Sequence, residues 1–232
     1  MTACNSCSDV LTADELAERS ATYGLLARVF FKPLDREAID ALAKVFVYEP
    51  GMGAGGEGCD DGRNDIARYL RRTHSGLREE LAADFTGAFY GAVTFEGRSA
   101  MPYESLFRYD GGRLMGEPRG EVYRAFKASC VRVHEGLDLP EDHLSFICSF
   151  MALLCDRTTE RLRAGDEHGV CELMAQQAAF FGEHVSGWYA DFQELAEHVV
   201  QTRFYRGFLK LGRAFVEDEA QRLAPYAKPK AA

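Results

Sequence analysis

The stretch that decides the fold is DLPEDHLSFICSFMALLCD, residues 138–156. Asp138 and Glu141 have the three-residue spacing of a capping box, which favours a helix start at Asp138. Apolar residues then recur every three or four positions, as on the buried face of an α-helix. These are Leu144, Ile147, Cys148, Met151, Leu154 and Cys155, with Phe146, Phe150 and Leu153 beside them. We therefore predict one largely buried helix whose first turn also carries Asp142 and His143.

Helical signals begin near the N-terminus. Thr12 and Glu15 form a capping box, and the helix that they start should end before Pro33. Asp35 can cap a second helix. Residues 49–65 are rich in glycine and have no periodicity, so we expect a flexible loop there.

The second half of the chain is also patterned as helices. Pro118 can open a helix that continues to Gly136, and another pattern covers 170–185. A long last helix should follow from Trp188 to Pro225. Because no segment shows sustained alternation with hairpin turns, we predict an all-α fold of about eight or nine helices.

Length and composition fit one globular domain. The chain has 232 residues, of which 47% are hydrophobic and 27% charged. We expect a helical domain over 12–224, made of two lobes that cover about 12–134 and 138–224. The tail 1–11 precedes it, and the tail 225–232 follows.

The charge balance restricts the partners. A net charge of −9 repels a phosphate backbone, so we expect no nucleic acid and favour a basic peptide instead. The N-terminus lacks the basic and apolar regions of a secretory signal, and no apolar run is long enough to span a bilayer. These features predict a cytoplasmic protein without an integral membrane segment.

Three weak motifs do not define a chemistry. Residues 51–56 read GMGAGG and match G-x-G-x-x-G, but a helix and not a strand precedes them, so we interpret them as loop. Cys4 and Cys7 form a C-x-x-C pair without the second pair of a zinc site, although zinc shared with a partner stays open. No histidine follows a glutamate by three residues, as bundle metal sites require. We expect no metal site and no catalytic residues.

The long connection from Gly91 to Pro118 is the second informative stretch. Connections longer than about 12 to 15 residues tend to be functional or disordered. This one carries Tyr103, Leu106, Phe107 and Tyr109, which are too many apolar and aromatic side chains for idle disorder. We therefore expect it to take part in function.

Both stretches carry a resemblance to a known family. MPYESLF at residues 101–107, with LMG at 114–116, is similar to the proline-aromatic-x-Ser-hydrophobic-aromatic loop of the redox-enzyme maturation chaperones that include TorD, DmsD and NarJ. LPEDHL at residues 139–144 resembles the Pro-Glu-Asp-His helix start of the same family. The resemblance covers nearly the whole chain, and the glycine-rich segment 49–65 departs from it.

The resemblance implies a function without catalysis or a cofactor. Proteins of this kind bind the twin-arginine signal peptide of a molybdenum-containing oxidoreductase and hold the apo catalytic subunit from export until its cofactor is inserted. Such a leader has a basic pair before an apolar stretch, so its receptor needs carboxylates beside an aromatic groove. The expected contacts are Glu104, Glu141 and Asp142 for the arginines, Tyr103, Phe107, Phe146 and Phe150 for the apolar part, and Ser105 and His143 within the same site, with His143 fixing the loop against the helix start.

Two other classes stay open. Some members of the family bind GTP, and a loop-rich pocket can hold a phosphate, although the sequence has no P-loop. A helical adaptor of another complex is the third reading. We expect a monomer or a domain-swapped dimer, with 133–139 as the hinge through which C-terminal helices would be exchanged.

Overall fold

The computed structural model describes residues 11–47, 59–72, 74–108, 112–134, 136–137 and 139–227. Within these ranges the chain forms nine α-helices and one two-stranded hairpin, which confirms the all-α prediction. The helices are α1 (Ala13–Phe31), α2 (Arg36–Val45), α3 (Cys59–Leu70), α4 (Leu77–Phe89), α5 (Glu117–Ala128), α6 (Leu144–Arg163), α7 (Glu167–His184), α8 (Tyr189–Val199) and α9 (Arg203–Leu223). Short 3-10 turns are η1 (Glu104–Leu106) and η2 (Ala224–Tyr226), and the hairpin joins β1 (Thr94–Phe95) to β2 (Arg98–Ser99) with Thr94 opposite Ser99.

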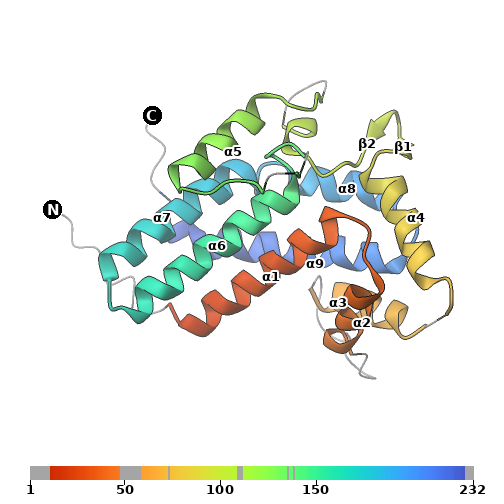
Figure 1. Ribbon diagram of the computed structural model, residues 1–232, viewed down its shortest axis with the longest axis horizontal. Helices are drawn as coiled ribbons and strands as arrows, with labels where there is room; N and C mark the ends of the chain where they lie inside the picture. Colours follow the sequence, from red (N-terminus) through yellow and green to blue (C-terminus); the bar gives the residue numbers. More distant parts are fainter. Residues whose placement is uncertain are drawn as a thin grey trace.

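Helices from the two halves of the chain pack against each other. In Figure 1, α1 lies along α6, and α3 lies beside α9 at the opposite end of the sequence. Aromatic rings in the core meet edge to face, as where Phe30 of α1 meets Phe89 of α4 and Phe192 of α8 at centroid distances of 5.2 and 5.7 Å. The division into two lobes stays a prediction.

The predicted caps at the N-terminus are confirmed. Thr12 and Glu15 form the reciprocal capping box of α1, whose last residue is Phe31. The Asp35 side chain accepts a hydrogen bond from the Ala38 N–H at the start of α2. Both caps depend on neighbouring residues alone, which explains why the sequence predicts them.

The glycine-rich segment is only partly described, and the described part corrects the prediction. Residues 59–65 belong to α3 and not to a flexible loop. Gly62 is buried against α9, where a Cβ on Gly62 would stand 2.6 Å from the carbonyl oxygen of Gly207. Glycine is therefore required on both helices because their backbones touch. The motif at 51–56, together with Cys4 and Cys7, lies outside the described residues.

Three helix boundaries differ from the predictions. α6 begins at Leu144, with His143 as its N-cap, and not at Asp138, which lies outside the described residues. α5 ends at Ala128, well before Gly136. The predicted last helix is two helices, because α8 ends at Val199 and Thr202 caps α9 anew.

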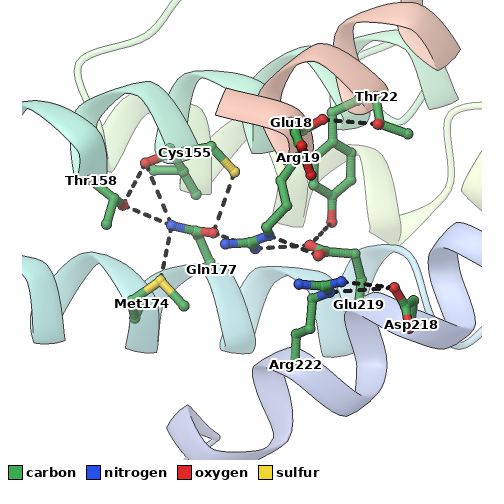
Figure 2. A network of polar contacts seen from close by, with 12 residues as sticks. Glu18, Arg19, Thr22, Cys155, Thr158, Met174, Gln177, Asp218, Glu219 and Arg222 are labelled. Carbon is green, nitrogen blue, oxygen red and sulfur yellow. Dashed lines mark hydrogen bonds and ion pairs between the residues drawn. The ribbon is translucent and has the colours of Figure 1, made fainter. Parts of the chain in front are cut away.

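A buried polar network joins four helices. Figure 2 shows the Arg19 guanidinium of α1 between Glu219 of α9 and Gln177 of α7. Both glutamate oxygens accept from Arg19, at 2.7 and 2.8 Å, and the Tyr23 hydroxyl also donates to Glu219 at 2.8 Å. The Gln177 amide donates to Thr158 of α6 at 2.8 Å. Almost every polar group of this interior site is therefore paired, which makes its burial tolerable.

In the part of the chain that the structure describes, none of the helices is long and apolar enough to cross a membrane.

Candidate functional site

The two motifs that the sequence analysis singled out meet in space. Residues 102–104 and 142–144 run antiparallel, with Tyr103 opposite His143. The Leu144 N–H donates to the Pro102 carbonyl at 2.8 Å, and the Glu104 N–H donates to the Asp142 carbonyl at 3.1 Å. The rings of Tyr103 and His143 meet edge to face at 4.8 Å. The loop is thus fastened to the start of α6, the role expected for His143.

Asp142 holds the loop through its side chain. Its Oδ2 accepts from the backbone N–H of Ser105 at 3.0 Å and also from the Ser105 hydroxyl. Both residues are buried, Asp142 completely. Its Oδ1 has no hydrogen-bond partner among the described residues. A buried carboxylate with two donors on one oxygen fixes the first turn of η1.

His143 is a neutral cap. Its Nδ1 accepts a hydrogen bond from the Ser145 N–H at 3.1 Å, which requires that this nitrogen carry no proton. Burial lowers the pKa of His143 to about 4, so the ring stays neutral near pH 7. The imidazole therefore stabilises the start of α6 and supplies no positive charge.

A second polar cluster lies where the loop meets α5 and α7. The buried Glu104 carboxylate lies 3.0 Å from Nδ1 of His184 and accepts from the Arg108 guanidinium at 2.8 Å. Arg108 donates also to Glu121 of α5 at 2.6 Å. Burial opposes the charge of Arg108, but the hydrogen bonds and charges of the two glutamates outweigh it and raise its pKa. Arg108 thus stays cationic between two carboxylates.

The single tryptophan reports on this cluster. The Trp188 Nε1–H donates to the His184 carbonyl at 2.6 Å, and the Phe107 ring stacks on the indole at 5.7 Å. Trp188 is buried, whereas Phe107 and Arg108 are partly exposed. Trp188 therefore contacts the motif loop through Phe107 and α7 through the His184 carbonyl.

The same cluster contains three residues of the types that ligate metal ions. Ligand atoms of Glu104, Glu121 and His184 lie within 4.8 Å of one another. Arg108 supplies positive charge to both glutamates in this arrangement. These three residues are the ones that could hold a metal ion if the guanidinium moved away.

The predicted site residues fall into two groups. Buried in this structure are Tyr103, Glu104, Ser105, Asp142, His143 and Phe150, whereas Phe107, Glu141 and Phe146 are partly exposed. Glu141 pairs with Arg119 of α5 at 2.6 Å, and Phe150 packs between Phe126 and Phe180 in the core. The prediction of an open groove with Glu104 and Asp142 on its walls is corrected here, because the junction of the motifs is closed and both carboxylates face the interior.

Two clefts flank the cluster instead. One of about 890 Å³ lies beside the hairpin and the motif loop, and its lining includes Arg98, Phe107, Arg108, Arg113 and Asp191. The other, of about 1160 Å³, follows α7 from His168 to Glu183 and is also lined by Gly187 and Ala227. Arg108 lines both clefts.

Sequence reasoning missed Arg108, Glu121 and His184. His184 carries a usable signal, because it continues the apolar face of Phe180 and Phe181 and is itself buried. A polar residue on a buried helical face needs a partner. The identity of that partner, Glu104, is 80 positions away and has no local signature.

Comparison with known proteins gives the class of this fold and site. A family model described as the nitrate reductase delta subunit matches residues 56–194. The chain belongs to this family.

Curated relatives are similar over almost their whole length. The chaperone protein TorD of Vibrio vulnificus strain YJ016 is 28% identical over 202 residues, which cover 85% of this chain and 91% of that protein. TorD of Shewanella pealeana is 25% identical over 212 residues, or 88% of each chain. A solved chain from Archaeoglobus fulgidus, described as a candidate redox enzyme maturation protein, is 16% identical with a TM-score of 0.48 and covers 87% of this chain and 93% of its own. The TorD relatives are named as chaperones and not as enzymes, which agrees with the expectation that this chain is not an enzyme.

Proposed function

We propose that this protein is a cytoplasmic maturation chaperone that binds the twin-arginine signal peptide of a molybdenum-containing oxidoreductase. It holds the apo catalytic subunit until the cofactor is inserted and export can follow. The observation that carries the proposal is the fastening of the two family motifs to each other, Pro102–Glu104 against Asp142–Leu144, in a chain whose curated relatives are TorD chaperones. The net charge of −9 favours a basic leader.

The nine predicted site residues have different roles in this proposal. Phe107, Glu141 and Phe146 reach the surface and contact the client. Of the buried members, Ser105, Asp142 and His143 act as positioning residues that hold the loop against α6. Pre-organised loops bind more tightly because less conformational entropy is lost on binding.

The direct test is a titration with a synthetic leader peptide. A peptide with two adjacent arginines followed by an apolar stretch should produce saturable heat in calorimetry and a shift in Trp188 emission. A peptide with glutamines in place of the arginines is the matched control and should bind at least about tenfold more weakly, because charge-assisted contacts are lost. Equal affinity for the two peptides would contradict a receptor for twin arginines.

The positioning role has its own test. Asp142→Asn removes the charge that orders Ser105 and should weaken peptide binding several-fold without loss of helical circular dichroism. Asp35→Asn, which alters a helix cap on α2, is the control and should leave binding unchanged. Unchanged affinity in Asp142→Asn would show that the order of the loop does not matter for the client.

A nucleotide is the second candidate ligand. Three arginines, Arg98, Arg108 and Arg113, line the cleft of about 890 Å³, and such a lining suits an anion. Binding of GTP by the purified chain, lost in Arg113→Gln, would support this reading. An absence of GTP binding by calorimetry at millimolar nucleotide would remove it.

A further inference from the structure

Arg108 occupies a position that a foreign arginine could take. Its guanidinium lies 2.8 Å from Glu104 Oε1 and 2.6 Å from Glu121 Oε2, so two carboxylates hold one cation. The Arg108 side chain is 27% exposed, whereas the Glu104 side chain is 0% exposed. Arg108 therefore covers the buried carboxylate from the solvent side and is the member of the cluster that can leave.

Arg108 is shared by two clefts. The cleft beside the hairpin and the groove along α7 both have Arg108 in their lining. Glu104 and Glu121 line neither of these two clefts while Arg108 is in place, so departure of the guanidinium would uncover both carboxylates beside the residue that the clefts share. The carboxylates would then lie beside both clefts, with the α7 groove leading away from them.

The groove along α7 has an apolar floor. Its central residues are small and follow helical spacing, and they are Cys171, Ala175, Ala178, Ala179 and Gly182. The stretch from Cys171 to Gly182 is about 16 Å long at 1.5 Å per residue. Small side chains leave room for another chain to approach the helix closely, and Glu172 and Glu183 add negative charge at the edges.

From these observations we infer that Arg108 is an intramolecular competitor that occupies the binding position of a client arginine. An arginine of the leader displaces Arg108 from Glu104 and Glu121, and the apolar segment that follows it lies along α7 between Cys171 and Gly182. This inference rests on the proposed function, whose client has this order of charge and hydrophobicity. The partner is thus a peptide in which an arginine precedes an apolar segment. This order matches the site, where the two carboxylates precede the apolar floor of the α7 groove.

The exchange conserves the interactions of the site. One guanidinium replaces another between the same two carboxylates, so no buried charge is left unpaired. His184, which lies 3.0 Å from Glu104, is a further partner of this carboxylate and does not depend on Arg108. Competition from Arg108 lowers the apparent affinity of the leader, because only the fraction of molecules with the site open can bind.

Calorimetry on the full chain tests the exchange with two substitutions that should change the peptide affinity in opposite directions. Arg108→Gln removes the competitor and should tighten binding of the arginine peptide by about fivefold to tenfold. In the Arg108→Gln chain, which has no competitor, adding Glu121→Gln removes one receptor charge and should weaken binding of the arginine peptide by about tenfold. The peptide with glutamines in place of its arginines should not distinguish either variant from the wild type.

A third variant tests the α7 groove. Ala179→Glu places a charge on the exposed floor and should weaken both peptides about tenfold. Ala17→Glu, an exposed alanine on α1, is the matched control and should change neither affinity. Equal behaviour of Ala179→Glu and Ala17→Glu would overturn the placement of the apolar segment.

The inference and the proposed function fail in different ways. If the wild type binds the arginine peptide and neither Arg108→Gln nor the added Glu121→Gln changes the affinity, the exchange is overturned and the proposed function stands. If neither the wild type nor Arg108→Gln binds the peptide, both are overturned. Retained thermal unfolding transitions in each variant confirm that the comparison is made on folded protein.

Discussion

Arg19 and Arg108 each meet a buried glutamate, but their surroundings differ. The Arg19 and Glu219 side chains are 5% and 0% exposed, and Gln177 and Tyr23 close the network around them. Arg108 is 27% exposed and is shared between Glu104 and Glu121 at the edge of two clefts. An arginine enclosed by four helices can only support the fold, whereas one at a cleft edge can also be exchanged.

Charge is retained at both sites for different reasons. Burial opposes the charge of Arg19, but the hydrogen bond and the charge of Glu219 outweigh it and raise its pKa. In Tyr23, burial raises the pKa of the hydroxyl, so this group stays a donor to Glu219. Arg19 and Tyr23 therefore both keep their protons across the ordinary range of pH. Four predictions sharpen the contrast, from the largest effect to the smallest.

Loss of the enclosed carboxylate should have the largest effect. Glu219→Ala leaves Arg19 charged and unpaired in the interior, and we expect the free energy of unfolding to fall by about 3–5 kcal/mol. Urea denaturation followed by circular dichroism measures this change. The double variant Arg19→Met with Glu219→Leu should recover most of it, because it removes both charges. A loss below about 1 kcal/mol in the single variant would contradict the enclosed character of the site.

The buried His143 should make stability depend on pH. Its folded pKa of about 4 lies below the unfolded value of about 6.5, so the unfolded chain takes up a proton that the folded chain refuses. Stability should therefore fall by about 2–3 kcal/mol as the pH decreases from about 6.5 to 4. His143→Asn keeps an N-cap acceptor and should lose this component. Identical pH profiles of the two chains would contradict it.

Removal of the exchangeable arginine should cost little stability. In Arg108→Gln, Glu104 keeps its contact with His184, and Glu121 is itself partly exposed. We expect the free energy of unfolding to fall by about 1 kcal/mol or less, measured in the same urea titration. A loss above about 3 kcal/mol would place Arg108 in the same structural class as Arg19 and break the comparison.

The smallest effect on stability is expected for Arg222, which lies one helical turn after Glu219. Figure 2 shows that Arg222 pairs with Asp218 and not with Glu219. The Arg222 side chain is 47% exposed, so Arg222→Gln should change the free energy of unfolding by about 0–0.5 kcal/mol. A loss comparable to that of Glu219→Ala would show that the interior network extends to the surface.

Local signals in the sequence predicted much of the fold. The capping box of Thr12 and the cap of Asp35 are confirmed because each involves residues that are three positions apart. The predicted start of α6 at Asp138 is wrong, although Asp138 and Glu141 have the spacing of a capping box. Backbone groups of Asp142 and Leu144 bond to the loop at 102–104, so the chain stays non-helical until His143.

The candidate site was predictable only in part. The two motifs were found from the sequence, and their meeting is confirmed by the pairing of Tyr103 with His143. The sequence does not indicate whether a carboxylate reaches solvent, because Glu104 and Glu141 are the same residue type and each lies in a family motif. Only packing buries the first under Arg108 and leaves the second partly exposed.

By itself the sequence determined the helices, most of their caps and the motifs, because these depend on side chains three or four positions apart. The tertiary structure decided which polar residues lie inside. Arg19 meets Glu219 across 200 positions, and Glu104 meets His184 across 80. Burial of a charge is a property of several packed helices together, and so is the difference between an arginine that supports the fold and one that a ligand can replace.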